Sequence, residues 1–392
     1  MVIKPKIRGF ICTNAHPVGC EASVLEQIEY VKSQGSVDCP KNVLVIGCST
    51  GYGLASRITA AFGAGANTLG VCFEKEPSER KTATAGWYNT AAFHKAAKQA
   101  NLYCKTLNGD AFSDAMKAQV IDLIKQDLGT VDAVIYSLAS PRRTDPKTGE
   151  TYNSQLKPIG KQYTTKTFDT SKEIVHEVTL DPATQDDIDN TVKVMGGEDW
   201  ELWMQALSEA GVLAKGCTTT AYTYIGKELT WPIYGHATIG KAKEDLDRAA
   251  AMINQQYQEL DVSAYVSSLK AVVTQASSAI PVMPLYISLM FKVMKEEGCH
   301  EGVIEQIYGL FNNLLFAQDP QLDEAKRLRM DTVETRDEIQ EKIKQRWAVV
   351  NSENFSELGD YTGYHLDFLK LFGFGFESVD YEQDVSPLAE WV

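Results

Sequence analysis

The chain has 392 residues, of which 44% are hydrophobic, and it carries a formal net charge of −14 at pH 7. This length and composition predict one large α/β domain with insertions, or two domains, with enough apolar material for a substantial core. The acidic balance argues against nucleic acid or an anionic membrane as the main partner, although it permits local basic patches for phosphate groups.

The eight cysteines and six histidines are scattered along the chain. No CxxC pair occurs and no histidine spacing resembles a zinc site, so the sequence predicts reduced, buried thiols and no metal centre. The N-terminal residues lack the apolar region of a signal peptide. No apolar run approaches the ~18 residues that a membrane span requires. We therefore expect a cytoplasmic protein that does not enter a membrane.

Residues 1–40 predict an extension before the first regular unit. Residues 7–20 can form a short strand pair, with Pro17 and Gly19 as turn signals. The pattern from Ala22 onward predicts a helix that ends at Gly35.

The most specific local pattern is a glycine-rich turn. Val43 to Ile46 is a continuous apolar run, as a buried parallel strand requires, and it leads into Gly47, Gly51 and Gly53 and then into a helical pattern. Glycines let such a turn tighten and let backbone N–H groups approach a pyrophosphate at the positive end of the helix. The order strand, glycine-rich turn, helix therefore indicates dinucleotide binding.

Acidic residues end the next two predicted strands. Residues 68–74 form the second strand, and Glu74 follows the glycine-rich turn by about 20 residues, where a carboxylate binds the adenosine ribose. It would repel a 2′-phosphate and so favours NADH over NADPH, although two basic neighbours could weaken this preference; the alternative is an exposed loop charge. A third strand begins at Tyr103 and ends at Asp110, where an acid commonly binds the adenine amino group.

A helix from Ser113 to Gly129 and a buried strand over residues 131–140 come next. The strand ends in small residues that leave room for a ribose and a nicotinamide. Residues 141–196 interrupt the alternation and predict an inserted hairpin or lid. Arg142 and Arg143 open this insertion, and they are either contacts for the phosphates of a substrate carrier or solvated loop charges.

The catalytic part of the chain is predicted at residues 218–243. A helix over 197–211 precedes it, with aromatic residues at core spacing, and a fifth strand brings Tyr224 to its carboxyl end. Tyr234 lies between a proline and a glycine, and a helix over about 238–257 follows. A lysine near a tyrosine hydroxyl favours the phenolate and so lowers the tyrosine pKa.

The remaining chain predicts one more core strand and a helical end. The sixth strand ends near 272–274, the segment 274–300 is the expected substrate-binding part, and 300–392 is a helical extension in which 369–376 is a seventh strand or a packed turn. We therefore predict a single α/β domain over 1–392. Its fold is expected to be Rossmann-like and doubly wound, with a mostly parallel sheet of about seven strands.

Open parallel sheets bind ligands beyond the carboxyl ends of their strands, where the glycine-rich turn, the acids and both tyrosines are predicted to lie. A dinucleotide with its nicotinamide near Leu138 and Tyr234 implies hydride transfer. A conjugated enoyl thioester suits this site, because hydride addition at its β-carbon places charge on the thioester oxygen, which a tyrosine O–H can stabilise.

Long blocks of the sequence resemble the FabV / trans-2-enoyl-CoA reductase family, an enlarged branch of the short-chain dehydrogenase/reductase superfamily. The resemblance covers nearly the whole chain. It rests on the 234–243 stretch and on these blocks: NAHPVGC, VLVIGCSTGYGLASRITAAFG, GWYN, GDAFSD, VIYSLASPRRT, KVMGGEDW, VVTQASSAIPVMPLY and FKVMKEEG.

The resemblance implies NADH-dependent reduction of the trans-2 double bond of enoyl-CoA or enoyl-acyl-carrier protein, the last reductive step of bacterial fatty-acid elongation, by a monomer. It implies that Tyr234 is the proton donor, that Tyr224 contacts the substrate and that Lys243 binds the nicotinamide half. The other implied cofactor contacts are Gly47, Cys48, Ser49, Thr50, Gly51, Tyr52, Phe73, Glu74, Asp110, Ala111, Leu138, Ala139, Val272, Val273 and Thr274.

Two lysines compete for the catalytic position. Six residues separate Tyr234 from Lys241, and eight separate it from Lys243. On a helix these lysines differ by ~200° in direction, so one of them at most faces the cofactor. The angle does not select between them, because Pro232 and Gly235 are expected to keep the tyrosine off the helix. The spacing of eight in the family favours Lys243.

Two other functions fit parts of the pattern. A carbonyl reductase acting on 3-oxoacyl thioesters would normally show a serine before a Tyr-x3-Lys motif, and residues 235–238 lack that lysine. A non-catalytic NAD-binding sensor is disfavoured by the presence of both Tyr234 and Lys243. The sequence leaves the physiological carrier and the preferred chain length open.

Overall fold

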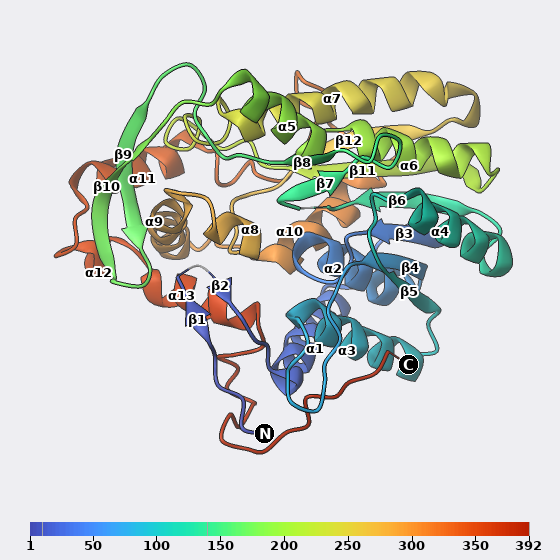
Figure 1. The fold of residues 1–392 in the computed structure, drawn as a ribbon, viewed down its shortest axis with the longest axis horizontal. Helices are drawn as coiled ribbons and strands as arrows, with labels where there is room; N and C mark the ends of the chain where they lie inside the picture. Colours follow the sequence, from blue (N-terminus) through green and yellow to red (C-terminus); the bar gives the residue numbers. More distant parts are fainter. Residues whose placement is uncertain (10, 139, 392) are drawn as a thin grey trace.

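A parallel β-sheet forms the centre of the molecule in a computed structural model that describes residues 1–9, 11–138 and 140–391 (Figure 1). Its seven strands have the order β13-β12-β11-β6-β3-β4-β5, and every neighbouring pair is parallel. The strands are β3 (Asn42–Ile46), β4 (Asn67–Cys72), β5 (Cys104–Asn108), β6 (Val131–Tyr136), β11 (Leu213–Thr223), β12 (Ser263–Ser268) and β13 (Leu328–Arg329). The predicted doubly wound sheet is confirmed.

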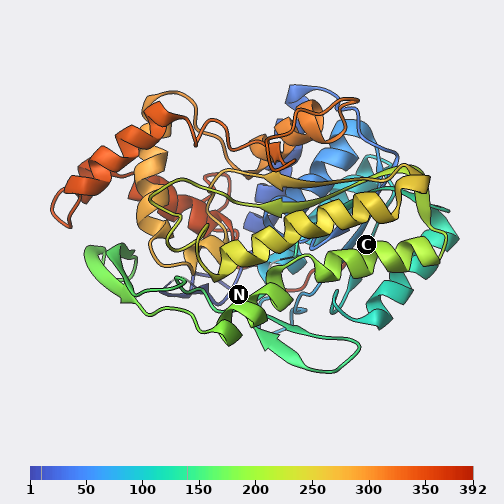
Figure 2. The same ribbon diagram turned by 90° about the horizontal axis from the view of Figure 1, so that it is seen from above.

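Helices cover both faces of this sheet (Figure 2). One face packs against α1 (Pro17–Gln34), α2 (Gly51–Ile58), α3 (Ala85–Gln99) and α10 (Val303–Leu310), and the other against α4 (Asp114–Asp127), α6 (Glu198–Glu209) and α7 (Thr238–Gln256). The aromatic face of α6 is fully buried, as predicted, through Trp200, Trp203, Met204 and Leu207. The helix α3 is an element that the sequence reading did not assign.

The insertion at 141–196 is larger than the single hairpin that was expected. It contains the hairpins β7 (Arg142–Thr144)–β8 (Thr151–Asn153) and β9 (Tyr163–Asp169)–β10 (Ile174–Leu180), followed by α5 (Gln185–Met195). Lys166 on β9 donates to three backbone carbonyls at the end of α11 (Asp337–Val349), those of Trp347, Ala348 and Val350. The β9–β10 hairpin is therefore joined to the C-terminal helices, beside which it lies in Figure 1.

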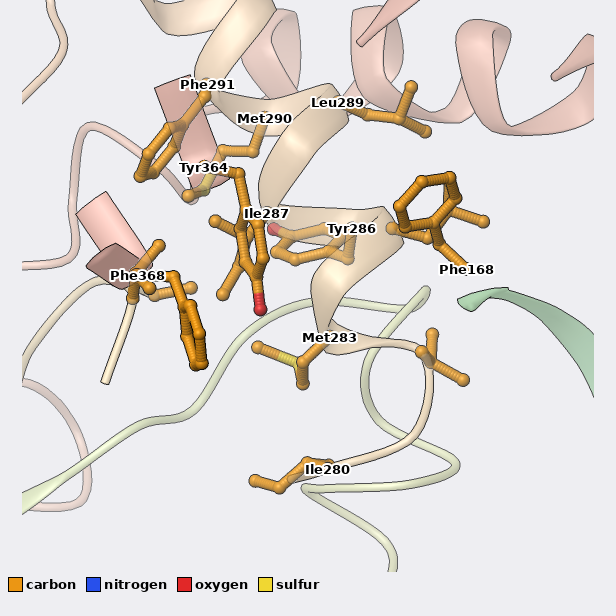
Figure 3. Packing of buried hydrophobic residues seen from close by; sticks show 14 of the residues in the cluster. Phe168, Ile280, Met283, Tyr286, Ile287, Leu289, Met290, Phe291, Tyr364 and Phe368 are labelled. Atoms are coloured by element: carbon orange, nitrogen blue, oxygen red, sulfur yellow. The ribbon is translucent and has the colours of Figure 1, made fainter. Parts of the chain in front are cut away.

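A third apolar cluster lies around α9 (Met283–Glu296), next to α8 (Gln275–Ser278), α12 (Phe355–Leu358) and α13 (Tyr361–Lys370). Figure 3 shows Tyr286, Ile287 and Met290 on α9 between Phe168 from the insertion and Phe368 from α13. Residues from distant parts of the chain thus enclose α9. The shorter helical turns are η1 (Thr59–Gly63), η2 (Gln258–Leu260) and η3 (Phe311–Leu315).

The predicted N-terminal strand pair is present as β1 (Ile7–Arg8) and β2 (Ile11–Cys12), but the expected turn at Pro17 is wrong. Pro17 begins α1, and His16 caps this helix by accepting a hydrogen bond from the Gly19 backbone N–H at 3.2 Å. Proline suits the first helical position because its missing N–H would have no intrahelical acceptor there.

One strand end differs from the expectation. The sixth strand ends at Ser268, so 272–274 lies beyond the hydrogen-bonded ladder. Of the two alternatives for 369–376, the structure has the packed turn, which follows the end of α13, and the seventh strand is β13. Gly373 in that turn has φ +78°, which favours a turn over a strand. Within the described residues, no helix is both long and apolar enough to cross a bilayer.

Candidate active site

The glycine-rich turn joins β3 to α2 at the carboxyl edge of the sheet. Gly47 has φ +87°, and a Cβ on Gly53 would lie 1.8 Å from the Gly47 carbonyl oxygen, so a side chain there has no room. Thr50 is extended and precedes α2. The first N–H groups of α2 have no acceptor within the helix and lie at its positive end. This cradle fits a pyrophosphate.

The other residues of the turn are tied to its surroundings. The Cys48 side chain is buried, and its backbone N–H donates to the Val71 carbonyl of β4 at 3.1 Å. Tyr52 donates its hydroxyl to the Lys270 carbonyl at 2.8 Å. Tyr222 is hydrogen-bonded to Ser56 of α2 at 2.6 Å, so it faces the cofactor helix and not Tyr234.

The predicted adenosine-binding acid Glu74 is held in place by the turn itself. Its carboxylate accepts hydrogen bonds from Ser49 at 2.5 Å and from Thr84, while its backbone N–H donates to Asn108 at 2.7 Å. Glu74 is thus partly buried and anchored, which favours the predicted role over that of an exposed loop charge. The neighbouring Phe73 side chain is 78% exposed, which leaves an apolar surface beside the carboxylate.

Asp110 and Ala111 follow β5 at the same edge. The Asp110 carboxylate accepts from the Phe112 backbone N–H at 3.0 Å, which closes the turn. Lys117 forms a buried ion pair with Asp199 at 2.9 Å and also donates to the carbonyls of this turn. This ion pair, which the sequence reading missed, fixes the turn to α6.

The expected nicotinamide-binding residues come from the ends of β6 and β12. Leu138 is half-buried and approaches Gly47, and Ala139 lies outside the described residues. Val272 and Val273 are buried. Thr274 caps the short helix α8 by accepting from the Ser277 backbone N–H at 3.0 Å. Leu138, the segment 272–274 and the glycine-rich turn lie at one edge of the sheet.

Tyr234 lies in the turns before α7, off the helix as predicted. A Cβ on Gly240 would be 2.0 Å from the Gly235 carbonyl oxygen, so the tyrosine loop packs directly on the first turn of α7. The Tyr234 side chain is 9% exposed, and none of the described residues hydrogen-bonds its hydroxyl. Burial raises the pKa of Tyr234, and no lysine offsets this, so the expected acidifying effect is absent and the phenol is neutral.

The two lysines of α7 point to different environments. Lys241 is exposed and pairs with Glu244 at 2.7 Å. Lys243 is half-buried, and its ammonium donates to the Tyr222 carbonyl at 3.4 Å. Burial, partly opposed by the Asp247 carboxylate, lowers the pKa of Lys243 to about 8. The geometry favours Lys243 as the lysine that faces the site.

Tyr224 follows β11 and packs edge-on against Tyr234, with ring centroids 4.9 Å apart. Its hydroxyl donates to the Glu334 carboxylate at 2.8 Å. Glu334 also accepts from Tyr286 of α9 at 2.7 Å. No local pattern indicates Glu334, because it lies in a charged stretch 110 residues from Tyr224.

The structure separates the two arginines that open the insertion. Arg142 is exposed, but the Arg143 side chain is buried, pairs with Glu198 at 2.7 Å and lies over the Phe112 ring. Arg143 is therefore unavailable as a surface contact for a carrier. Arg142 remains accessible, and a further basic residue of this hairpin, Lys147 between β7 and β8, is also exposed.

The site thus combines a glycine-rich cradle at the point where the strand order reverses, an anchored acid just beyond β4, and a buried tyrosine and a half-buried lysine at the other end. This combination is typical of a nicotinamide-dependent oxidoreductase. No set of residues at this edge resembles a Tyr-x3-Lys site within the described chain.

Comparison with known proteins gives the family. Residues 81–316 match the trans-2-enoyl-CoA reductase catalytic region, residues 2–79 match the NAD(P)H binding domain of trans-2-enoyl-CoA reductase, and residues 322–385 match an enoyl reductase FAD binding domain. The chain belongs to the trans-2-enoyl-CoA reductase family, so the resemblance seen in its motifs is confirmed.

Individual relatives agree with this assignment. The enoyl-acyl-carrier-protein reductase (NADH) of Pseudoalteromonas atlantica is 71% identical over 100% of both chains, and FabV of Aeromonas salmonicida is 60% identical over 99% of this chain and 98% of its own. The trans-2-enoyl-CoA reductase of Treponema denticola, solved with NAD, is 48% identical with a TM-score of 0.96, covering 100% of this chain and 99% of that one.

A substitution in the glycine-rich turn tests the cradle. Gly53→Ala should abolish NADH binding, because its Cβ would collide with the Gly47 carbonyl and displace the turn. Titration followed by NADH fluorescence measures this. Gly129→Ala is the matched control, since Gly129 has a positive φ but open space around it, and its variant should bind NADH as the wild type does. Unchanged NADH affinity in Gly53→Ala would contradict the assignment.

Proposed function

We propose that this chain reduces the trans-2 double bond of enoyl thioesters with NADH. The observation that carries the proposal is the placement of Tyr234, Tyr224 and Lys243 beside the same sheet edge as the glycine-rich turn. Family membership supports it, since relatives are enoyl-acyl-carrier-protein reductases (NADH) and a Clostridium trans-2-enoyl-CoA reductase with a TM-score of 0.96 was solved with NADH.

The cofactor would be held along the carboxyl edge. The turn at 47–52 would bind the pyrophosphate. The adenosine would be bound by Phe73, Glu74, Asp110 and Ala111, and the nicotinamide half by Leu138, Ala139, Lys243 and 272–274. NADH, when bound, supplies a hydride to the β-carbon of the substrate. Glu74 disfavours a 2′-phosphate by charge repulsion, which accounts for a preference for NADH.

Tyr234 would stabilise the charge that develops on the thioester oxygen. Its hydroxyl has no competing partner among the described residues, and burial keeps the phenol neutral, so its O–H is available to donate. A donor in a dry site stabilises an enolate oxygen more strongly than the same donor in water. Tyr234 is therefore the proposed proton donor.

Lys243 would act on the ribose side of the site. Its ammonium is turned inward from α7, close to the strand end that carries Tyr224. A cation there attracts the negatively charged cofactor. In the cofactor-free protein, burial is the main cause of both the lowered pKa of Lys243 and the raised pKa of Tyr234.

We further propose that the protein is a monomer in the bacterial cytoplasm and that it accepts both enoyl-CoA and enoyl-acyl-carrier protein. The names of its relatives include both carriers. A net charge of −14 opposes an acidic carrier protein at long range, so docking would depend on a local basic region such as Arg142 and Lys147. Reduction at this point completes one cycle of fatty-acid elongation.

Turnover measures the proposed reaction directly. NADH absorbance should fall when crotonyl-CoA or a long-chain enoyl-acyl-carrier protein is added, and more slowly with NADPH. Tyr234→Phe should lower kcat by about 10²- to 10⁴-fold, the range for loss of a general acid, while NADH affinity stays near that of the wild type. Absence of NADH oxidation with every enoyl thioester would refute the enzyme assignment, and oxidation with 3-oxoacyl thioesters instead would identify a carbonyl reductase.

The two lysines give a second test. Lys243→Ala should abolish turnover because the inward cation is lost, whereas Lys241→Ala removes an exposed ion pair with Glu244 and should leave steady-state rates nearly unchanged. Circular dichroism checks that both variants fold. The reverse result would assign the catalytic role to Lys241.

The pH dependence follows from the lowered pKa of Lys243. Since its ammonium form is the active one, kcat/KM for NADH should fall as the pH rises through about 8. The negative charge of a bound cofactor raises the lysine pKa, so the fall in kcat should lie at higher pH. Lys241→Ala is expected to keep both profiles. A kcat/KM that stays level up to pH 10 would contradict this role for Lys243.

A further inference from the structure

A buried carboxylate connects the parts of the site. Glu334 is fully buried in the segment between β13 and α11. One of its oxygens accepts hydrogen bonds from the hydroxyls of Tyr224 at 2.8 Å and Tyr286 at 2.7 Å, and the other accepts from the Ala271 backbone N–H at 2.6 Å. Its three donors come from the residue after β11, from α9 and from the segment after β12.

The Ala271 N–H belongs to a peptide unit that is held from both sides. The carbonyl of this unit, on Lys270, accepts the Tyr52 hydroxyl at 2.8 Å. Its N–H donates to Glu334. A single peptide plane thus joins the glycine-rich turn, which contains Tyr52, to Glu334, and it immediately precedes the buried Val272 and Val273. Rotation of this peptide would break both hydrogen bonds.

The charge of Glu334 is balanced inside the protein. Burial raises the pKa of Glu334, and the nearby Lys270 ammonium and the three hydrogen bonds oppose this rise. Lys270 is itself buried and donates to the carbonyls of Ala271 at 3.0 Å and Glu301 at 2.9 Å. Removing one of two buried charges leaves the other uncompensated, which makes this pair costly to disrupt.

The hydrogen bonds also set the direction of the Tyr224 proton. A phenol has one O–H, and a carboxylate oxygen can only accept. Because Tyr224 donates to Glu334, its oxygen presents lone pairs to its other neighbours. Tyr286 donates to the same oxygen of Glu334 and accepts from Gln340 at 3.0 Å (Figure 3 shows its place on α9).

We infer that Glu334 is a positioning residue for the reduction. It accepts the Tyr224 proton, so Tyr224 cannot donate to the thioester oxygen and Tyr234 is the tyrosine that does. It also holds the Lys270–Ala271 peptide, which leads into the segment proposed to face the nicotinamide. This inference rests on the proposed function. The residues matched to the FAD binding domain family, 322–385, thereby contribute Glu334 to the site.

Glu334→Gln tests this role with little change in shape. The glutamine amide donates hydrogen bonds, so it cannot accept at all three positions, and Tyr224 or the Ala271 N–H must lose its acceptor. A hydrogen bond to a charged group contributes about 1.5–3 kcal/mol, so kcat should fall roughly 10- to 100-fold. NADH affinity is expected to fall less than kcat, because the cradle around Gly47 and Gly53 is intact.

Asp331→Asn is the matched control. Asp331 is also fully buried, lies three residues earlier in the same segment, and accepts from Ser268 at 2.8 Å and from Arg329 at 2.7 Å. It touches neither Tyr224 nor Ala271. Its variant should lose thermal stability in the same way as Glu334→Gln yet keep kcat near that of the wild type. Equal losses of both stability and kcat in the two variants would overturn the inference.

A double-mutant cycle separates positioning from a general structural effect. If Glu334 acts through Tyr224, then Glu334→Gln should reduce kcat much less in a Tyr224→Phe background than in the wild type. Fully additive losses would overturn the link between the two residues. If Glu334→Gln does not fold, Glu334→Asp replaces it, since this variant keeps the charge but draws it back from the tyrosines; its kcat should fall while NADH binding persists, and an unchanged kcat would overturn the inference.

The outcomes distinguish this inference from the proposed function. A wild-type protein that does not oxidise NADH with any enoyl thioester refutes the function itself. An active wild type with a Glu334→Gln variant whose kcat is unchanged refutes the positioning role and leaves the function standing.

Discussion

The structure depends on a close backbone contact where the glycine-rich turn crosses the end of the sheet. Because Gly53 has no side chain, α2 begins against the Gly47 carbonyl, and the turn can pack on the end of β6. All seven strands are parallel, so every other strand also ends at this edge. Glu74, Asp110 and Tyr224 therefore lie on one side of the molecule simply because each follows a strand of the parallel sheet.

Burial by the C-terminal half gives that edge its chemistry. The cluster around α9 and the segment that carries Glu334 cover the strand ends and exclude water from them. The same exclusion moves two pKa values in opposite directions, raising that of Tyr234 and lowering that of Lys243, because burial disfavours the charged form of each. Burial therefore explains both why the Tyr234 phenol stays neutral and why the Lys243 ammonium loses its proton more readily than a lysine in water.

Much of this arrangement was predictable because it depends on local patterns. Residues 42–58 form a strand, a glycine-rich turn and a helix, and consecutive residues carry the pattern of each. The N-cap of α4 is equally local, since Ser113 accepts from the Met116 N–H at 3.2 Å. Parallel strands with helical connections leave few topologies, so the fold class followed from their order. The site residues at strand ends followed from the same rule.

The remaining features depend on contacts between distant residues. Nothing in a single sequence indicates that Arg143 turns inward to Glu198, that Lys117 pairs with Asp199, or that Glu334 lies behind Tyr224. The choice between Lys241 and Lys243 also required the packing of α7, since helical angle gives their relative direction but not which side faces the sheet.

The amino-acid sequence by itself indicated the family through long blocks of resemblance. It also determined the parallel sheet, the cofactor edge and the tyrosines and lysines that compete for the chemistry, because these are encoded in spacing over a few turns or strands. The tertiary structure decided which of these side chains are buried and to which acceptor each hydroxyl donates its proton. It also decided how the C-terminal segment completes the site. Burial and hydrogen-bond direction arise only when segments far apart in the chain meet.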